Sequence, residues 1–187
     1  MDEFSYLSVL IAVILGLAIT QILQGFRGLL HSREKVVMYW PSLVWAGLIM
    51  LIAVQSWWAS FGLRRQTHWS FLGFTVVLVE NICIYMVAAL VLPDFAEERH
   101  VDLKRSYFKQ VPWFYGLFIL ALVFSLLKDV VLSGSLPYGA NLAFQSFFIA
   151  GSAALIAVRN ETFHKIYAVV SAALFLAYIA DLFRDLH

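Results

Sequence analysis

Long apolar segments alternate with short polar connections along almost the whole chain. Six of these segments are long enough to cross a lipid bilayer, and they cover residues 4–26, 41–63, 69–92, 112–132, 141–158 and 165–183. A helix rises about 1.5 Å per residue, so the first segment would span about 35 Å, against a hydrocarbon core of about 30 Å. Backbone amides inside hydrocarbon must be hydrogen bonded within helices or closed barrels. The pattern therefore predicts an all-α, polytopic integral membrane protein with six transmembrane helices.

The composition agrees with this prediction. Hydrophobic residues make up 62% of the chain and charged residues 13%, with a mean hydropathy of +0.82, whereas soluble domains carry about 25% charged residues. Helices in lipid are held together by close packing and by hydrogen bonds, so we expect residues 1–187 to form one six-helix transmembrane domain in a single bundle. The charged connection at residues 94–109 separates three segments from three, which makes a 3+3 inverted repeat a hypothesis.

The basic residues predict the orientation in the membrane, because short loops rich in Lys and Arg stay in the cytoplasm. With both termini outside, four basic residues face outward (Arg64, Arg65, Lys128 and Arg184), and nine face the cytoplasm (Arg27, Arg33, Lys35, Arg99, Lys104, Arg105, Lys109, Arg159 and Lys165). The sequence thus favours both termini outside, and we expect a bacterial inner (plasma) membrane. Membrane lipids are the expected neighbours, and a homo-oligomer is the expected assembly.

Several functional classes are excluded by residue content. The net charge is +1 and no basic stripe with interleaved aromatic residues lies outside the apolar segments, so we expect no nucleic-acid partner. The single cysteine, Cys83, can form neither a disulfide nor a cysteine metal site within one chain. The chain has no nucleophile elbow, zinc-binding helix or phosphate-binding loop, and we therefore expect no enzyme.

The histidines argue against a haem site. A haem between helices needs histidines deep in the membrane, whereas His31, His68, His100, His164 and His187 lie in connections, at segment ends or at the terminus. We expect no cofactor and no metal ion. His68 and His164 are candidate pH sensors, but a solvated loop histidine is the simpler interpretation of both.

Two residue patterns predict how the helices pack. Trp57 and Trp58 are about 100° apart on a helix, so one of them should point into the bundle. Small residues gather in the last two segments, around Gly151 in the fifth and between Ala172 and Ala180 in the sixth. Small residues let transmembrane helices approach closely, so these two segments should pack tightly together.

Glu80 is the residue that most needs an explanation. It lies near the middle of the third segment, where a charged side chain costs a few kcal/mol and is expected to face the protein interior or a wet cavity. A carboxyl group in this position is suited to carrying a proton or holding a cation. The alternative is a protonated or hydrogen-bonded Glu80 that links helices, with Asn81 and a nearby glutamine as its partners.

Other polar residues lie toward the same leaflet in the predicted topology. Gln55 joins Glu80 and Asn81 as a candidate ion or proton site, and a polar vestibule leading to it would include Lys128, Asp129, Gln145 and Asp181. Lys128 has Asp181 as a candidate ion-pair partner. The alternative for Lys128, Asp129 and Asp181 is that they reach the headgroups by snorkelling.

These residues predict a small membrane channel or transporter in which Glu80 binds a proton or a small cation. The main alternative is a non-transporting membrane subunit or scaffold, whose polar residues link helices or bind a partner. A third class, a membrane enzyme acting on lipid, depends on Lys128, Asp129 and Asp181 converging.

Overall fold

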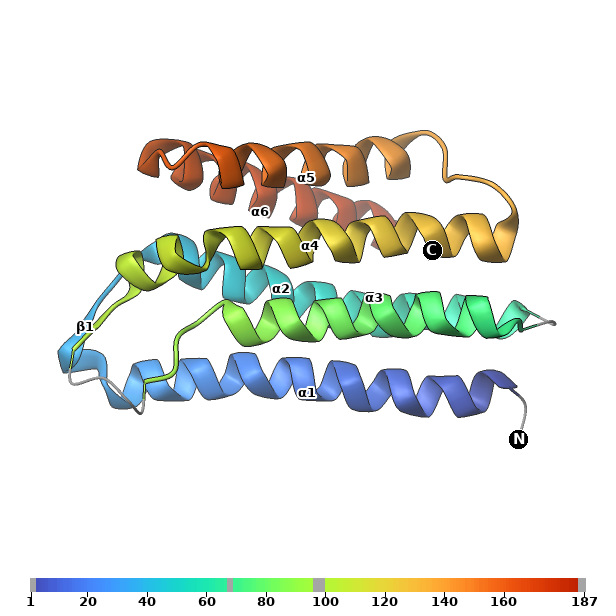
Figure 1. Ribbon diagram of the computed structural model, residues 1–187, viewed down its shortest axis with the longest axis horizontal. Helices are drawn as coiled ribbons and strands as arrows, with labels where there is room; N and C mark the ends of the chain where they lie inside the picture. The colour runs from blue at the N-terminus through green and yellow to red at the C-terminus, as the bar shows by residue number, and fades with distance from the viewer. Residues whose placement is uncertain (1–2, 67–68, 96–99, 185–187) are drawn as a thin grey trace.

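A computed structural model describes residues 3–66, 69–95 and 100–184, with the backbone alone for the last four. In these ranges the chain forms six α-helices, each long and apolar enough to span a membrane: α1 (Glu3–His31), α2 (Trp40–Ser60), α3 (Phe71–Leu90), α4 (Leu103–Ser133), α5 (Ala140–Ala157) and α6 (Glu161–Arg184). Successive helices run in opposite directions, so α1 begins and α6 ends toward the same end of the bundle, here called the terminal end (Figure 1). The all-α, six-helix prediction is confirmed.

Two helices begin earlier than the apolar pattern indicates, because a polar side chain caps each of them. Asp102 accepts hydrogen bonds from the backbone N–H groups of Lys104 and Arg105, at 2.9 and 3.1 Å, and α4 starts at Leu103. The fourth apolar segment begins at Pro112, and proline is common in the first turn of a helix, which predicts a helix start there. That prediction is wrong, since Pro112 lies inside α4. In the same way, Asn160 caps α6 through Thr162 and Phe163.

A short 3-10 helix and two short strands lie in the connections at the end opposite the terminal end. A 3-10 helix, η1 (Arg33–Lys35), leads into strand β1 (Val36–Val37). This strand pairs in parallel with β2 (Val101–Asp102), with Val36 opposite Val101. The pairing joins the α1–α2 connection to the start of α4, residues that lie far apart in the sequence (Figure 1). At the terminal end, a second 3-10 helix, η2 (Phe61–Arg65), extends α2.

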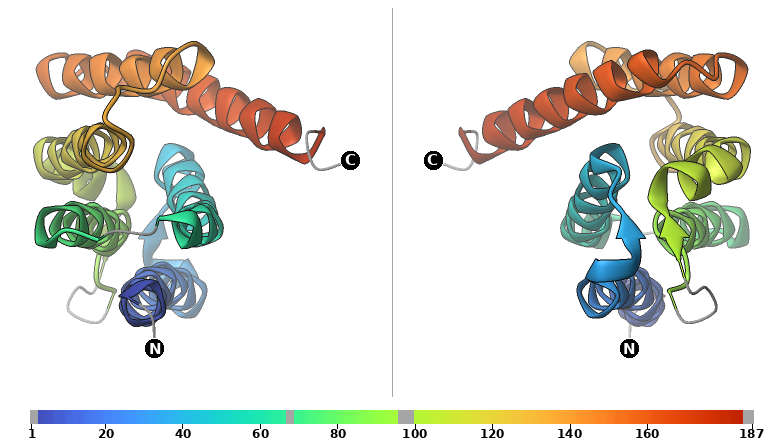
Figure 2. Two further views of the ribbon diagram at one scale, coloured as in Figure 1. Left: turned by 90° about the vertical axis from the view of Figure 1, so that its right-hand side faces the viewer. Right: turned by 90° about the vertical axis from the view of Figure 1, so that its left-hand side faces the viewer.

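The helices stack in layers, with α1 on one side, α2 and α3 next to it, α4 beyond α3, and α5 and α6 on the other side (Figure 2). The α3–α4 interface is the most extensive one, and α1 packs closely on α3. A Cβ added at Gly25 of α1 would lie 2.8 Å from the Leu92 side chain, so the glycine permits this close approach. The halves pack differently, because α1 contacts α3 extensively but α4 has no comparable contact with α6. The inverted repeat stays a hypothesis.

An aromatic cluster fills the bundle near the end opposite the terminal end. Trp45 of α2 is fully buried at its centre. Its indole ring meets three α4 rings edge-on, with centroid distances of 5.4 to 5.8 Å, and stacks on a ring of α6 at 6.0 Å. Edge-to-face arrangements are the favoured geometry for aromatic pairs. The members of this cluster are Trp45, Phe114, Tyr115, Phe118 and Tyr167.

Helices α5 and α6 pack closely only near their connection, and then α6 diverges toward α2 (Figure 2). Near the connection, Gly151 leaves room for the ring of Tyr167, whose hydroxyl donates a hydrogen bond to the Phe148 carbonyl at 3.4 Å. Farther along, Phe144 stacks on Tyr178 with a centroid distance of 5.0 Å, so large rings fill the widening space. The predicted tight packing of small residues is therefore limited to one end of this helix pair.

Substituting Gly151 tests the close contact with Tyr167. A Cβ at this position would lie 2.6 Å from Cζ of the Tyr167 ring, which is held between Trp45 and Phe147 and has little room to move. We expect Gly151→Ala to lower the free energy of unfolding in detergent by about 1–3 kcal/mol, the usual cost of overpacking. Gly47→Ala is the matched control, because nothing lies within 4 Å of its Cβ position. An equal effect of both substitutions on thermal melting would contradict this contact.

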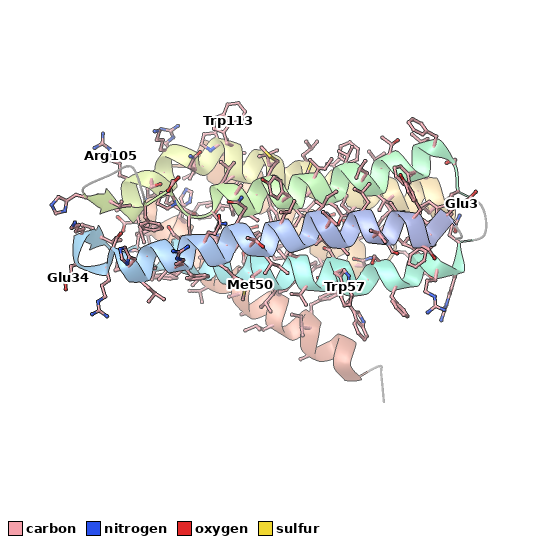
Figure 3. The ribbon with its side chains drawn as sticks, turned by 90° about the horizontal axis from the view of Figure 1, so that it is seen from below. Glu3, Glu34, Met50, Trp57, Arg105 and Trp113 are labelled. Atoms are coloured by element: carbon pink, nitrogen blue, oxygen red, sulfur yellow. The ribbon has the colours of Figure 1, made fainter. Side chains whose placement is uncertain are left out.

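Both tryptophans of the adjacent pair face outward. Trp57 is 51% exposed and Trp58 is 59% exposed, so the prediction that one of them points into the bundle is wrong. Trp57 and Trp113 project from opposite sides of the bundle in Figure 3. These rings lie where a bilayer would surround the helices, and aromatic rings of this kind favour the headgroup region.

Candidate functional site

A cavity of about 400 Å³ lies among helices α2, α3, α4, α5 and α6. Its wall includes six of the seven residues proposed from the sequence, namely Gln55, Glu80, Asn81, Lys128, Asp129 and Gln145. The seventh, Asp181, lies in α6 at a position whose side chain is outside the described residues. Residues from four helices, as far apart in the chain as Gln55 and Gln145, are thus brought to one place.

The cavity extends from the terminal end deep into the bundle. Near that end its wall includes Gly62 of η2 and Asn141 at the start of α5. At its deep end it includes Val87 of α3 and Phe118 of α4. Val87 lies about 24 Å along α3 from the first residue of the helix, at about 1.5 Å per residue. A hydrocarbon core is about 30 Å thick, so the wall reaches well past the middle of a membrane-sized span.

The cavity contains an ion pair between α3 and α4. The Lys128 ammonium donates to both carboxylate oxygens of Glu80, with Nζ–O distances of 2.9 and 2.8 Å. The side chains are largely buried, with exposed fractions of 11% for Glu80 and 22% for Lys128. A short distance to each oxygen is typical of a charge-assisted hydrogen bond. Glu80 is therefore neither alone in the bundle nor turned toward lipid.

Helix direction explains why these two side chains meet. Glu80 lies about 14 Å from the start of α3, and Lys128 lies about 8 Å from the end of α4, at about 1.5 Å per residue. Side chains on a helix tilt toward its N-terminus. In this antiparallel pair Glu80 therefore leans toward the terminal end and Lys128 leans away from it, so the two side chains approach each other. Of the options proposed for Lys128, snorkelling is wrong, because its ammonium is directed into the bundle and pairs with Glu80.

Two buried side-chain amides in the wall leave acceptor oxygens without a partner among the described residues. Asn81 is 5% exposed and donates through Nδ2 to the Val77 carbonyl at 2.7 Å, while its Oδ1 accepts nothing. Because a carbonyl can only accept, this bond fixes which end of the Asn81 amide is oxygen. Gln145 is 7% exposed, donates to Asn141 Oδ1 at 3.3 Å, and likewise leaves Oε1 unpaired. Buried acceptors of this kind are rare in folded proteins and call for a donor.

The charges in the described part of the wall do not cancel. Glu80 and Lys128 neutralise each other, which leaves Asp129 as the third charged residue of the wall. Asp129 follows Lys128 directly on α4 and is half-buried. When its carboxyl group is ionised, Asp129 gives the described part of the wall one net negative charge. Gln55 adds a neutral polar side chain from α2.

The rest of the wall is mainly apolar and aromatic. Phe118, Phe144, Phe148, Phe175 and Tyr178 contribute to it from α4, α5 and α6. Phe118 also belongs to the aromatic cluster around Trp45, which lies beyond the deep end of the cavity. The cavity thus extends to residues near the terminal end and is bounded by packed rings toward the opposite end.

A second polar group adjoins the aromatic cluster and shares Tyr115 with it, and the sequence did not predict this group. His164 is fully buried in the first turn of α6, so the interpretation of this residue as a solvated loop histidine is wrong, and His68 lies outside the described residues. His164 Nε2 donates to the Val158 carbonyl at 3.1 Å, which leaves Nδ1 to accept from the Tyr107 hydroxyl at 2.9 Å. Tyr107 in turn accepts from the Tyr115 hydroxyl at 2.6 Å. The result is a continuous chain of hydrogen bonds linking α4 to α6.

Removing the central hydroxyl of this chain tests it. Tyr107→Phe deletes a group that contacts both Tyr115 and His164, and leaves two buried polar atoms without a partner. We expect the free energy of unfolding in detergent to fall by about 2–3 kcal/mol, since each unsatisfied buried polar group costs about 1–3 kcal/mol. Tyr138→Phe is the control, because Tyr138 is 90% exposed. If both variants melt at the wild-type temperature, the chain of hydrogen bonds does not form.

Comparisons with known proteins assign no family to the chain: no family model, no curated protein and no solved structure matches it. Among the described residues, no group of three or more His, Cys, Asp or Glu side chains is placed to hold a metal ion. What the chain can do must therefore be argued from the cavity itself.

Proposed function

We propose that this protein is a small membrane transporter whose cavity binds a monovalent cation or a proton. The observation that carries the proposal is the ion pair of Glu80 and Lys128 inside a cavity that reaches past the middle of the helical bundle. Charged side chains at this depth are costly, and in membrane proteins they mark substrate and ion pathways. A cavity with polar side chains in its wall is a setting in which a solute can reach them.

The charge of the wall favours a cation over an anion. Counting the described residues alone, Asp129 leaves the wall one net negative charge, and Asn81 and Gln145 offer oxygens without a partner. Oxygen acceptors of this kind replace the hydration shell of a cation, whereas an anion needs donors. Lys128, the one cation in the described wall, is already paired with Glu80.

The closed end of the cavity favours a transporter over an open channel. Trp45 and its neighbouring rings fill the bundle beyond the cavity, which supports a site whose solute exchanges with the terminal end only. Alternating access requires a site that opens to one side at a time. In this proposal, the aromatic cluster separates and repacks when the cavity opens to the opposite side.

We also propose that the terminal end faces the outside. The basic residues of the described helices and connections gather mostly at the opposite end, as the positive-inside rule requires of a cytoplasmic surface. Glu34 and Arg105 both lie at that opposite end, and Glu3 lies at the terminal end (Figure 3). With this orientation the cavity takes up its solute from outside.

A second candidate function is a non-transporting membrane subunit or scaffold. The observation in its favour is that the Glu80–Lys128 pair joins α3 to α4 across the most extensive helix interface, as a structural link would. In that case the cavity is a packing defect, and its unpaired oxygens bind water or a partner protein.

Uptake into proteoliposomes separates the two functions. We expect the purified protein to catalyse uptake of at least one cation from a set of Na⁺, K⁺, protons and alkylammonium ions, at a rate above that of empty liposomes. Asp129→Asn keeps the shape of the wall but removes its net charge, so uptake should fall about tenfold, equal to about 1.4 kcal/mol. Glu34→Gln, an exposed carboxylate outside the cavity, is the control. Uptake no faster than that of empty liposomes for every ion would refute transport and favour the scaffold.

A further inference from the structure

We infer that the cavity recognises a primary organic ammonium ion with an apolar body, such as an arylalkylamine. This inference rests on the proposed function and names the class of its substrate. It combines three observations on one cavity: a carboxylate that already holds a primary ammonium, unpaired amide oxygens with one net negative charge, and an aromatic wall.

The Glu80–Lys128 contact shows that a primary ammonium fits among these groups. Lys128 places its –NH₃⁺ group within 2.9 Å of both oxygens of Glu80, so the wall accommodates the size and the donor geometry of this ion. An ammonium carries three donors and no acceptor. A ligand ammonium, like that of Lys128, requires hydrogen-bond acceptors and negative charge around it. It would bind beside the Glu80–Lys128 pair, whose two charges already neutralise each other.

Three wall residues outside this pair are suited to a cation that carries several hydrogen-bond donors. Asn81 Oδ1 and Gln145 Oε1 are buried acceptors without a partner among the described residues, and the orientation of the Asn81 amide is fixed by Val77. Asp129 supplies the unbalanced negative charge of the same cavity. A bound ammonium thus provides donors for the amide oxygens and balances the charge of Asp129 in the described part of the wall. A neutral alcohol brings at most one donor and no charge.

The aromatic part of the wall requires an apolar body on the ligand. Phe144, Phe148, Phe175 and Tyr178 line the cavity from α5 and α6, across from the polar residues of α3 and α4. A cavity of about 400 Å³ is within the size range of small-molecule sites, which are mostly apolar with a few placed polar groups. Aromatic faces also attract cations. An inorganic ion would make no apolar contact with the aromatic residues, whereas an arylalkylamine can contact the aromatic residues with its ring and the polar residues with its ammonium group.

Binding of 2-phenylethylammonium to the full chain in nanodiscs tests the inference. We expect radiolabelled 2-phenylethylamine to be retained above empty nanodiscs at neutral pH, and 2-phenylethanol, its neutral analogue, to compete about tenfold more weakly, a difference of about 1.4 kcal/mol. Asp129→Asn and Asn81→Leu should each weaken amine binding about tenfold, with little effect on the alcohol. Glu34→Gln is the matched control, and thermal melting verifies that each variant is folded.

The outcomes distinguish this inference from the proposed function. Equal competition by the amine and the alcohol, or no retention above empty nanodiscs, would overturn the inference even if inorganic cations are taken up by proteoliposomes. Selective amine binding without uptake of any cation would support the inference and refute transport, leaving a membrane receptor or binding subunit for amines.

Discussion

Lys128→Met should lower the free energy of unfolding in detergent by about 3 kcal/mol. This is the largest effect on stability that we expect among the substitutions proposed for this chain. Breaking a buried ion pair from one side costs about 3–5 kcal/mol, because the remaining charge is left buried without compensation. Glu80 is that remaining charge, and its side chain is 11% exposed. The expected loss is at the lower limit because the Glu80 carboxylate borders the cavity and is not fully buried.

The double variant Glu80→Gln/Lys128→Met should recover most of this loss, since removing both charges also removes the uncompensated one. Lys165→Met is the control for losing a lysine at the surface. Lys165 pairs with Glu161 at 2.8 Å, but the two side chains are 40% and 35% exposed, and such pairs contribute at most about 1 kcal/mol. The measurement is thermal melting followed by circular dichroism. Wild-type melting of Lys128→Met, or a double variant less stable than the single one, would contradict the pairing.

Ser125→Trp should abolish uptake into proteoliposomes, which is the largest functional effect that we expect. Ser125 lies on α4 between Phe118 and Lys128 and forms part of the cavity wall. An indole in its place fills the route past the ion pair without adding or removing a charge. We expect uptake to fall more than about tenfold, equal to a rise of more than about 1.4 kcal/mol in the barrier for transport.

Val123→Trp is the matched control on the same helix. Val123 is two residues away, 37% exposed on the outer surface, and not part of the cavity wall. The same ring placed there meets lipid, where aromatic side chains are tolerated. Uptake should therefore stay near the wild-type rate in this variant. Equal uptake by the two folded variants would show that solutes do not pass through this cavity.

Much of the fold follows from local sequence features. Six apolar segments are visible without any knowledge of tertiary structure, because a bilayer requires the same length and polarity of every spanning helix. The starts of α4 and α6 were misplaced because hydropathy falls at the caps Asp102 and Asn160, although each helix continues into the polar connection. Pro112 added to the error in α4, since proline often marks a first turn but is also tolerated inside transmembrane helices.

The site was predictable as a set of residues but not as a network. Glu80 is identifiable from the sequence because an ionisable residue in an apolar segment is costly. The same reasoning identifies Gln55 and Gln145, which are polar residues in apolar segments. Its partner could not be identified in the same way. Lys128 is 48 residues away, and the pairing depends on the register of α3 against α4, which tertiary packing alone determines.

The hydrogen-bonded series of Tyr115, Tyr107 and His164 could not be predicted from any local sequence pattern. His164 lies next to polar residues in a short connection, which is typical of a solvated position. It is buried because Asn160 starts α6 early and because α4 extends past Pro112 to place Tyr107 beside the imidazole. In both cases a helix extends into a polar connection, and such an extension cannot be recognised from hydropathy.

The accessibility of a single cysteine in the cavity wall is the most direct test of this account. Ser56→Cys places a thiol in the wall, Val54→Cys places one on the outer face of the same helix α2, and Cys83→Ala removes the buried native thiol from both. A charged, membrane-impermeant thiol reagent should modify Cys at position 56 from the side of the terminal end and not from the opposite side, and should leave position 54 unmodified. Equal modification of the two positions, or no modification of position 56 from either side, would contradict a water-filled cavity beside the Glu80–Lys128 pair.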